Sequence, residues 1–177
     1  MIAFQVGDKV VHRTFGPGEV PRLEEKQLAG LSRLYYVVQV SKLTLWVPVV
    51  GADERSLRFI MEGTDFKKLY KILRSPGEPL TDDRHQRQIE LVERMQEGTL
   101  EGLCRIIRDL AARSHFRKLN ENDSSIMNHA LELLLSEWQL SQGMPAKEVR
   151  RQLDALLEES KEATQRSVDR LPTPIHN

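Results

Sequence analysis

The sequence predicts an α+β fold in which a small curled β-barrel precedes an all-α helical bundle. Two observations lead to this expectation. Residues 1–50 consist of β-branched and aromatic runs separated by glycine turns, which is typical of short strands. From about residue 64 onward, apolar residues recur at spacings of three and four, which is the period of amphipathic helices. The loop Ser75-Pro76-Gly77 marks the expected domain boundary.

Four segments of the N-terminal part have strand character. They read DKVVH, GEVPRLEEKQ, RLYYVVQV and LTLWVPV, and glycine-containing turns separate them. Pro21 and Pro48 lack the N–H group that a sheet ladder needs, so each is expected at a bulge, an edge or a strand end. Because an exposed sheet edge can accept another chain, this part is also a candidate docking module.

Five helices are expected in the rest of the chain. The first follows Thr64 as a candidate cap. The others cover about residues 81–96, 100–117, 123–141 and 145–162, with Thr99 as a cap and Pro145 in a first turn. Three apolar stripes should build one core: Leu100, Leu103, Ile107 and Leu110; Met127, Ala130, Leu134 and Trp138; and Val149, Leu153 and Leu156.

The expected organisation has four parts. They are a β-barrel over residues 1–60, a connecting helix and loop over 61–76, a helical domain over 77–163 and a flexible tail over 164–177. The tail is expected because QRSVDRLPTPIHN contains two prolines and few apolar residues.

The composition indicates a globular protein without a membrane segment. Hydrophobic residues make up 40% of the 177 residues, and the start MIAFQVGDK lacks the basic and apolar regions of a signal peptide. No apolar run approaches the roughly 18–20 residues of a membrane span. We therefore expect a cytoplasmic protein. The single cysteine, Cys104, cannot form an internal disulfide or a multi-thiolate zinc site, so a plain buried thiol is expected.

Little in the sequence favours catalysis. The five histidines are scattered, and the motifs HExxH, GxSxG and the P-loop are absent. We predict a binding protein rather than an enzyme, with no cofactor, no metal site and no small-molecule substrate.

The net charge of the chain is zero, but its two halves carry net charges of opposite sign. Residues 1–74 contain 12 Lys and Arg against 8 Asp and Glu, whereas residues 75–177 contain 14 against 18. Nonspecific nucleic-acid binding needs several clustered cations. Any contact of the acidic C-terminal half with DNA should therefore be local, weak and strongly salt-dependent.

The frame FQVGDKVVHRTFGPGEV, followed by Gly30, RLYYVVQV and LTLWVPV, resembles the opening of the CarD/CdnL family of bacterial transcription regulators. The same module resembles the RNA-polymerase interaction domain of the transcription-repair coupling factor. The resemblance continues through ILRSPGEPL, EGTLEGLCRIIRDLAAR and LNENDSSIMNHALELLLSE, and covers about residues 2–160. It implies an SH3/Tudor-like barrel that docks on the RNA polymerase β subunit. It also implies a helical domain that contacts promoter DNA at the upstream edge of the bubble and stabilises the open complex.

The resemblance places the DNA contacts at the start of the first C-terminal helix, where this chain departs from the family. The family's wedge tryptophan falls at Arg84, with His85 beside it and Arg87 at a usual basic position. Arginine can enter a narrow minor groove, but it has no large apolar face to prop an unstacked base step. Asp82 and Asp83 directly before it would be repelled by phosphate.

A second basic position of the family falls near Ser124, so its charge is lost as well. For the stretch TDDRHQRQ an ordinary solvated helix turn remains an equal alternative to a surface presented to DNA or protein.

On the barrel, the resemblance places a polymerase-contacting cation at Lys26. The family commonly has a second such cation where this chain has Trp46, so the chain departs from the family here as well. Trp46, beside Val47 and Pro48 at a strand end, is either an interface anchor or half-buried packing. Arg33 is a further candidate contact. Two alternatives stay open: the helical domain of a divergent member binds a protein partner instead of promoter DNA, or the barrel edge serves as an adaptor for a partner other than polymerase.

Overall fold

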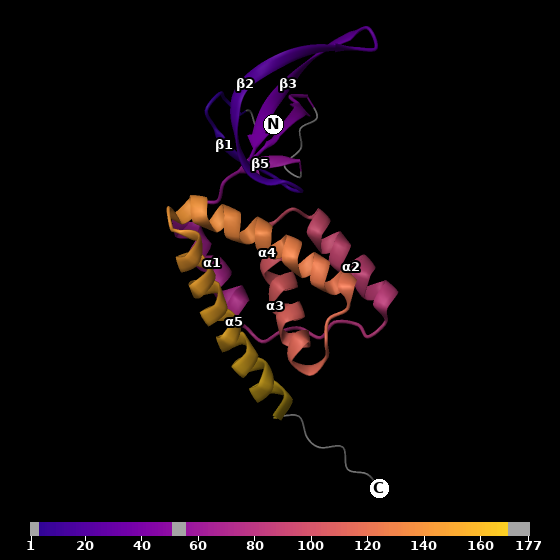
Figure 1. Cartoon of the computed structure of the whole chain (residues 1–177), viewed down its shortest axis with the longest axis vertical. Helices are drawn as coiled ribbons and strands as arrows, with labels where there is room; N and C mark the ends of the chain where they lie inside the picture. The colour runs from indigo at the N-terminus through magenta and orange to yellow at the C-terminus, as the bar shows by residue number, and fades with distance from the viewer. Residues whose placement is uncertain (1–3, 51–55, 170–177) are drawn as a thin grey trace.

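The structure is a computed structural model that describes residues 4–50 and 56–169, and it confirms the α+β prediction (Figure 1). Within the described residues an N-terminal sheet lies against a group of helices. The antiparallel strands are β1 (Lys9–His12), β2 (Gly16–Leu28), β3 (Leu31–Val40), β4 (Leu43–Pro48) and β5 (Leu57–Phe59), in the order β4-β3-β2-β1-β5. The helices are α1 (Gly63–Arg74), α2 (Arg84–Gln96), α3 (Leu100–Phe116), α4 (Glu121–Gln142) and α5 (Ala146–Asp169).

The sheet curls around a core to which all five strands contribute. Its buried members are Phe4, Val10, Val20, Tyr36, Val38, Val40, Val47 and Leu57. The first four strands match the predicted runs, whereas β5 was not predicted because three residues are too few to show an alternation.

The positions of the two strand prolines follow from their missing N–H groups. The β2–β3 register shifts between Glu19 and Arg22, which places Pro21 in an irregularity of the ladder. Pro48 ends β4, an outer strand of the sheet. The β2–β3 hairpin turns at Ala29 and Gly30, whose φ angles are 52° and 79°, and it extends away from the helices (Figure 1).

Side-chain caps begin three of the helices. Asp83 accepts a hydrogen bond from the Gln86 N–H, Thr99 from Gly102 and Asn120 from Asp123. The prediction for Thr99 is confirmed, but the one for Thr64 is wrong, because α1 begins after Glu62 without a side-chain cap.

The predicted apolar stripes form the core of the helical domain. Trp138 is fully buried between the rings of Phe66 and Tyr70, at centroid distances of 5.4 and 5.3 Å. Cys104 is also buried in this core, and burial raises the pKa of its thiol, as expected for an inert cysteine.

Two of the expected domain limits differ in the structure. Phe66, Leu69 and Leu73 of α1 pack in the same core, so α1 belongs to the helical domain and is not a connecting helix. At the other end, α5 continues to Asp169, past the expected start of the tail at residue 164. Residues 170–177, where the rest of the tail was expected, lie outside the described residues.

The junction between sheet and helices is organised by Glu137 of α4. Its side chain is 1% exposed and accepts hydrogen bonds of 2.7 Å from both Nη atoms of Arg58 and one of 3.0 Å from the backbone N–H of Met61. Ser141, one turn further along α4, donates to the Met61 carbonyl, and Gln142 donates to that of Gly63. The segment that joins the two domains is therefore bound along one side of α4.

One prediction follows from the cap of α2. Asp83→Ala should lower the free energy of unfolding by about 1 kcal/mol, because the Gln86 N–H loses its acceptor. Asp83→Asn is the matched control, since it keeps an acceptor oxygen and should behave nearly as the parent. Urea denaturation of the three proteins measures the difference. An equal loss in both variants would show that the charge, and not the hydrogen bond, is what stabilises the helix start.

Candidate functional site

Four of the five predicted docking residues lie on one face of the sheet. Directly opposed residues of antiparallel strands point to the same side. Lys26 is opposite Arg33, and on the neighbouring strand pair Trp46 is opposite Val37 and Pro48 is opposite Tyr35. We call the face that carries Lys26, Arg33, Trp46 and Pro48 the outer sheet face.

Lys26 and Trp46 are in direct contact on the outer sheet face. The Lys26 Nζ lies 3.6 Å from the centroid of the Trp46 ring, and Trp46 is 41% exposed. Such an exposed cation–π pair stabilises the arrangement by about 0.5–1 kcal/mol. Glu24 lies beside it, 3.8 Å from the Lys26 Nζ, and a hydrogen bond from Arg22 is the main cause that lowers the pKa of Glu24. The face therefore presents a pre-positioned aromatic ring among charged groups.

Val47, the fifth predicted docking residue, points the other way. Side chains alternate along a strand, so an outward Trp46 requires an inward Val47. Val47 is buried in the core of the sheet. The structure therefore does not place its side chain on the outer sheet face.

The three predicted DNA contacts at the start of α2 differ in their exposure to solvent. Arg84 and His85 are exposed, whereas Arg87 is 2% exposed. The Arg87 Nε lies 3.2 and 3.1 Å from the two carboxylate oxygens of Asp123 on α4, and its Nη1 donates to the carbonyls of Thr81 and Asp82. Arg87 is thus a structural residue whose donors are used inside the protein, and the expectation that it contacts DNA is corrected.

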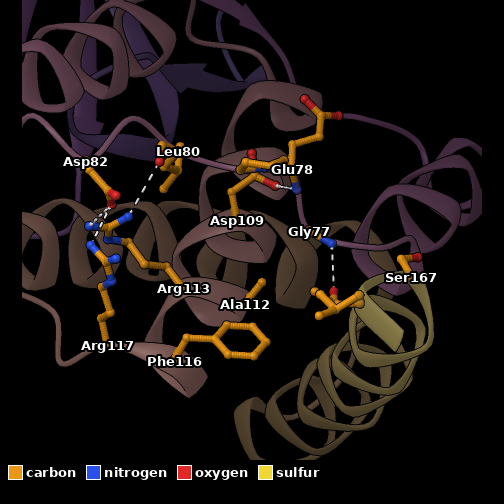
Figure 2. A pocket seen from close by; sticks show the side chains of 13 residues that line it. Gly77, Glu78, Leu80, Asp82, Asp109, Ala112, Arg113, Phe116, Arg117 and Ser167 are labelled. Atoms are coloured by element: carbon orange, nitrogen blue, oxygen red, sulfur yellow. Dashed lines mark hydrogen bonds and ion pairs between the residues drawn. The ribbon is translucent and has the colours of Figure 1, made fainter. Parts of the chain in front are cut away.

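The residues around Asp82 form a basic pocket of about 280 Å³. Asp82 accepts hydrogen bonds from Arg113 at 3.2 Å and Arg117 at 2.8 Å, as Figure 2 shows. The hydrogen bond from Arg113, followed by the charge of Arg117, lowers the pKa of Asp82, so this carboxylate stays ionised at neutral pH. The basic pocket is lined by Asp82, Arg84, Arg87, Arg113, Arg117, Lys118, Asn120 and Asp123.

Three cations of this pocket were missed in the sequence. Arg113 lies in the last turn of α3, Arg117 caps the helix and Lys118 follows it, about thirty positions from Arg84. Basic residues at a helix C-terminus ordinarily complement the helix dipole. The run RSHFRK was the available signal.

Comparison with known proteins gives two adjoining matches. Residues 4–61 match the CarD-like/TRCF RID domain, and residues 68–154 match the C-terminal domain of CarD. The chain belongs to the CarD family. "Putative transcription factor YdeB" of Bacillus subtilis (strain 168) is 23% identical to it over 149 residues, which cover 83% of this chain and 97% of that protein.

Membership of the CarD family makes this chain a transcription regulator, and the RID-type match implies interaction with RNA polymerase in general. The first match covers the described sheet, and the second begins inside α1 and ends inside α5.

Two negative findings hold for the described residues, 4–50 and 56–169. No helix there is long and apolar enough to cross a membrane. No group of three or more His, Cys, Asp or Glu residues in the same ranges could hold a metal ion.

Proposed function

We propose that this CarD-family regulator docks on the β subunit of RNA polymerase through its outer sheet face and acts at promoter open-complex formation in the cytoplasm. It does so by binding alone, without catalysis. The proposed docking rests on the contact between Lys26 and the half-exposed Trp46, which lie in a domain of the RID type. Aromatic residues with a fixed orientation are frequent anchors of protein interfaces, because little conformational entropy is lost when they are covered.

The proposed contact with promoter DNA near the upstream bubble edge rests on the basic pocket. Arg84, Arg113, Arg117 and Lys118 line it, and Asp82 pairs with Arg113 and Arg117. Arg87 and Asp123, the other charged pair of the pocket, neutralise each other. A cluster of this size supports a weak, salt-dependent phosphate contact, which suits a domain that polymerase brings close to DNA.

The docking proposal predicts that Lys26→Glu combined with Trp46→Ala weakens binding to the isolated β-subunit lobe by at least about tenfold. Biolayer interferometry with the full chain measures this. Leu43→Ala is the control, because Leu43 is an exposed apolar residue of the same strand outside the outer sheet face.

A thermal melt of this double variant distinguishes an interface role of Trp46 from a packing role. An unchanged melt with lost affinity supports docking, since Trp46 and Lys26 are partly exposed and their removal leaves no cavity. Unchanged affinity would place the polymerase contact elsewhere on the chain. A collapsed melt would make Trp46 a packing residue instead.

A further inference from the structure

An apolar groove adjoins the basic pocket on the helical domain. It has a volume of about 540 Å³, within the usual range of ligand clefts (about 300–1,000 Å³), and lies between residues 77–82, the end of α3 and the last turns of α5. Its apolar lining comes from Pro79, Leu80, Ala112, Phe116 and Val168.

Phe116 is the largest apolar side chain that lines this groove, and more than half of its surface is exposed to solvent. It is the last residue of α3, is 57% exposed and is not among the residues of the helical core. Figure 2 shows its ring extending from α3 toward α5, while Arg113 and Arg117 meet Asp82 at the other end of the groove. An aromatic face in this position can stack on a planar ligand without any rearrangement of the core.

The groove and the basic pocket are continuous. Asp82, Arg113 and Arg117 line both of them, so an anion-binding wall directly adjoins an exposed aromatic ring. At the end of the groove away from the basic pocket, Glu78 forms an ion pair with Arg108. The excess of positive charge therefore lies on the side of the basic pocket.

We propose that the groove and the basic pocket together bind an unpaired nucleotide of a single-stranded nucleic acid. Its base stacks on Phe116, and its phosphate contacts Arg84, Arg117 and Lys118. Neighbouring cations and an exposed aromatic ring are the two elements of sequence-tolerant single-strand binding. A duplex can supply the phosphates, but its stacked bases are not free to cover the ring. This inference deepens the proposed contact with promoter DNA and rests on it, while polymerase docking is independent of it.

Asp82 is the group that an incoming phosphate must displace in this arrangement. Its carboxylate holds Arg113 and Arg117 and would compete with an incoming phosphate. Removing the negative charge should therefore free two guanidinium groups for the ligand.

The test is fluorescence anisotropy of the full chain with end-labelled oligo(dT) and with a duplex of equal length, at several salt concentrations. Phe116→Ala should weaken single-strand binding by about tenfold and leave duplex binding nearly unchanged. Phe116→Tyr, which keeps the aromatic face, should bind as the parent does. Arg117→Ala should weaken binding of both ligands and reduce the salt slope by about 1. Asp82→Asn should tighten both by about twofold to fivefold.

Leu140→Ala is the matched control, because Leu140 is an exposed apolar residue on α4 that lines neither cavity. The proposal is overturned if Phe116→Ala leaves oligo(dT) binding unchanged, or if it weakens duplex binding as much. It is equally overturned if the variant loses affinity for polymerase but not for oligo(dT), since the groove would then bind protein. Lost affinity of the Lys26→Glu, Trp46→Ala protein for polymerase, with oligo(dT) binding intact, would separate docking from this site.

Discussion

Glu137→Ala should lower the free energy of unfolding by about 3 kcal/mol, because it leaves the Arg58 guanidinium at the domain junction without its counter-ion. The same change removes the acceptor of the Met61 N–H, which an alanine cannot replace. The third donor of Arg58, Nε, remains on the Gly98 carbonyl at 3.3 Å, so the guanidinium cannot simply turn away into solvent. Urea denaturation followed by circular dichroism gives the change in free energy.

Glu132→Ala controls for the loss of an acidic residue from α4. Glu132 lies on the same helix but is exposed, so its removal should change stability by less than about 0.5 kcal/mol. Arg58→Ala should lower stability in the same direction, and the double variant should cost less than the sum of the two single changes. Additive effects in this cycle would mean that the two side chains do not stabilise the junction through each other.

This junction has a functional consequence. Glu137, Ser141 and Gln142 bind the segment between the domains, and Gly16, the first residue of β2, lies close to Leu133 of the same helix. These contacts join the sheet to the helical domain that carries the basic pocket. We expect a partner docked on the outer sheet face to leave the basic pocket a restricted range of directions.

The sequence predicted the fold because its signals are periodic. The stripe that contains Leu103 and Ile107 repeats with the helical period over several turns, and the YYVVQV run has strand composition throughout. The same reasoning missed β5, which has three residues, and it separated α1 from the helical domain because the loop Ser75-Pro76-Gly77 has the composition of a domain linker. Which helix pairs share a core depends on tertiary packing, which local composition does not report.

The candidate site was predicted in part. Lys26 and Trp46 were named from the resemblance, but their contact depends on the β2–β3–β4 register, which no local pattern encodes. For the basic pocket, Arg84 was named while Arg113 and Arg117 were not, since only the fold brings the end of α3 to Asp82. Sequence reasoning therefore lacked the strand register and the tertiary proximity at these positions, and at Arg87 it lacked the burial.

The contrast between Arg84 and Arg87 tests this conclusion. Arg87→Ala should lower the free energy of unfolding by about 3–5 kcal/mol, because it leaves Asp123 as a buried carboxylate without its cation. The carbonyls of Thr81 and Asp82, which accept from Arg87 Nη1, would also lose that donor. Arg84→Ala, three positions earlier on the same helix and exposed, should change stability by less than about 0.5 kcal/mol. Urea denaturation measures both.

For DNA binding we expect the reverse of the stability effects: Arg84→Ala should change binding, and Arg87→Ala should not. Under conditions in which both variants are folded, Arg84→Ala should weaken oligo(dT) binding and reduce its salt slope, since one phosphate contact of the basic pocket is lost. Arg87→Ala should leave the salt slope unchanged, because its charge is already matched by Asp123. A stable Arg87→Ala protein with a reduced salt slope would mean that Arg87 leaves Asp123 to bind phosphate, and that the buried pair is a switch rather than a fixed support. Asp123→Asn separates these outcomes: it should destabilise a fixed support, whereas it should increase DNA affinity if Asp123 restrains a mobile arginine.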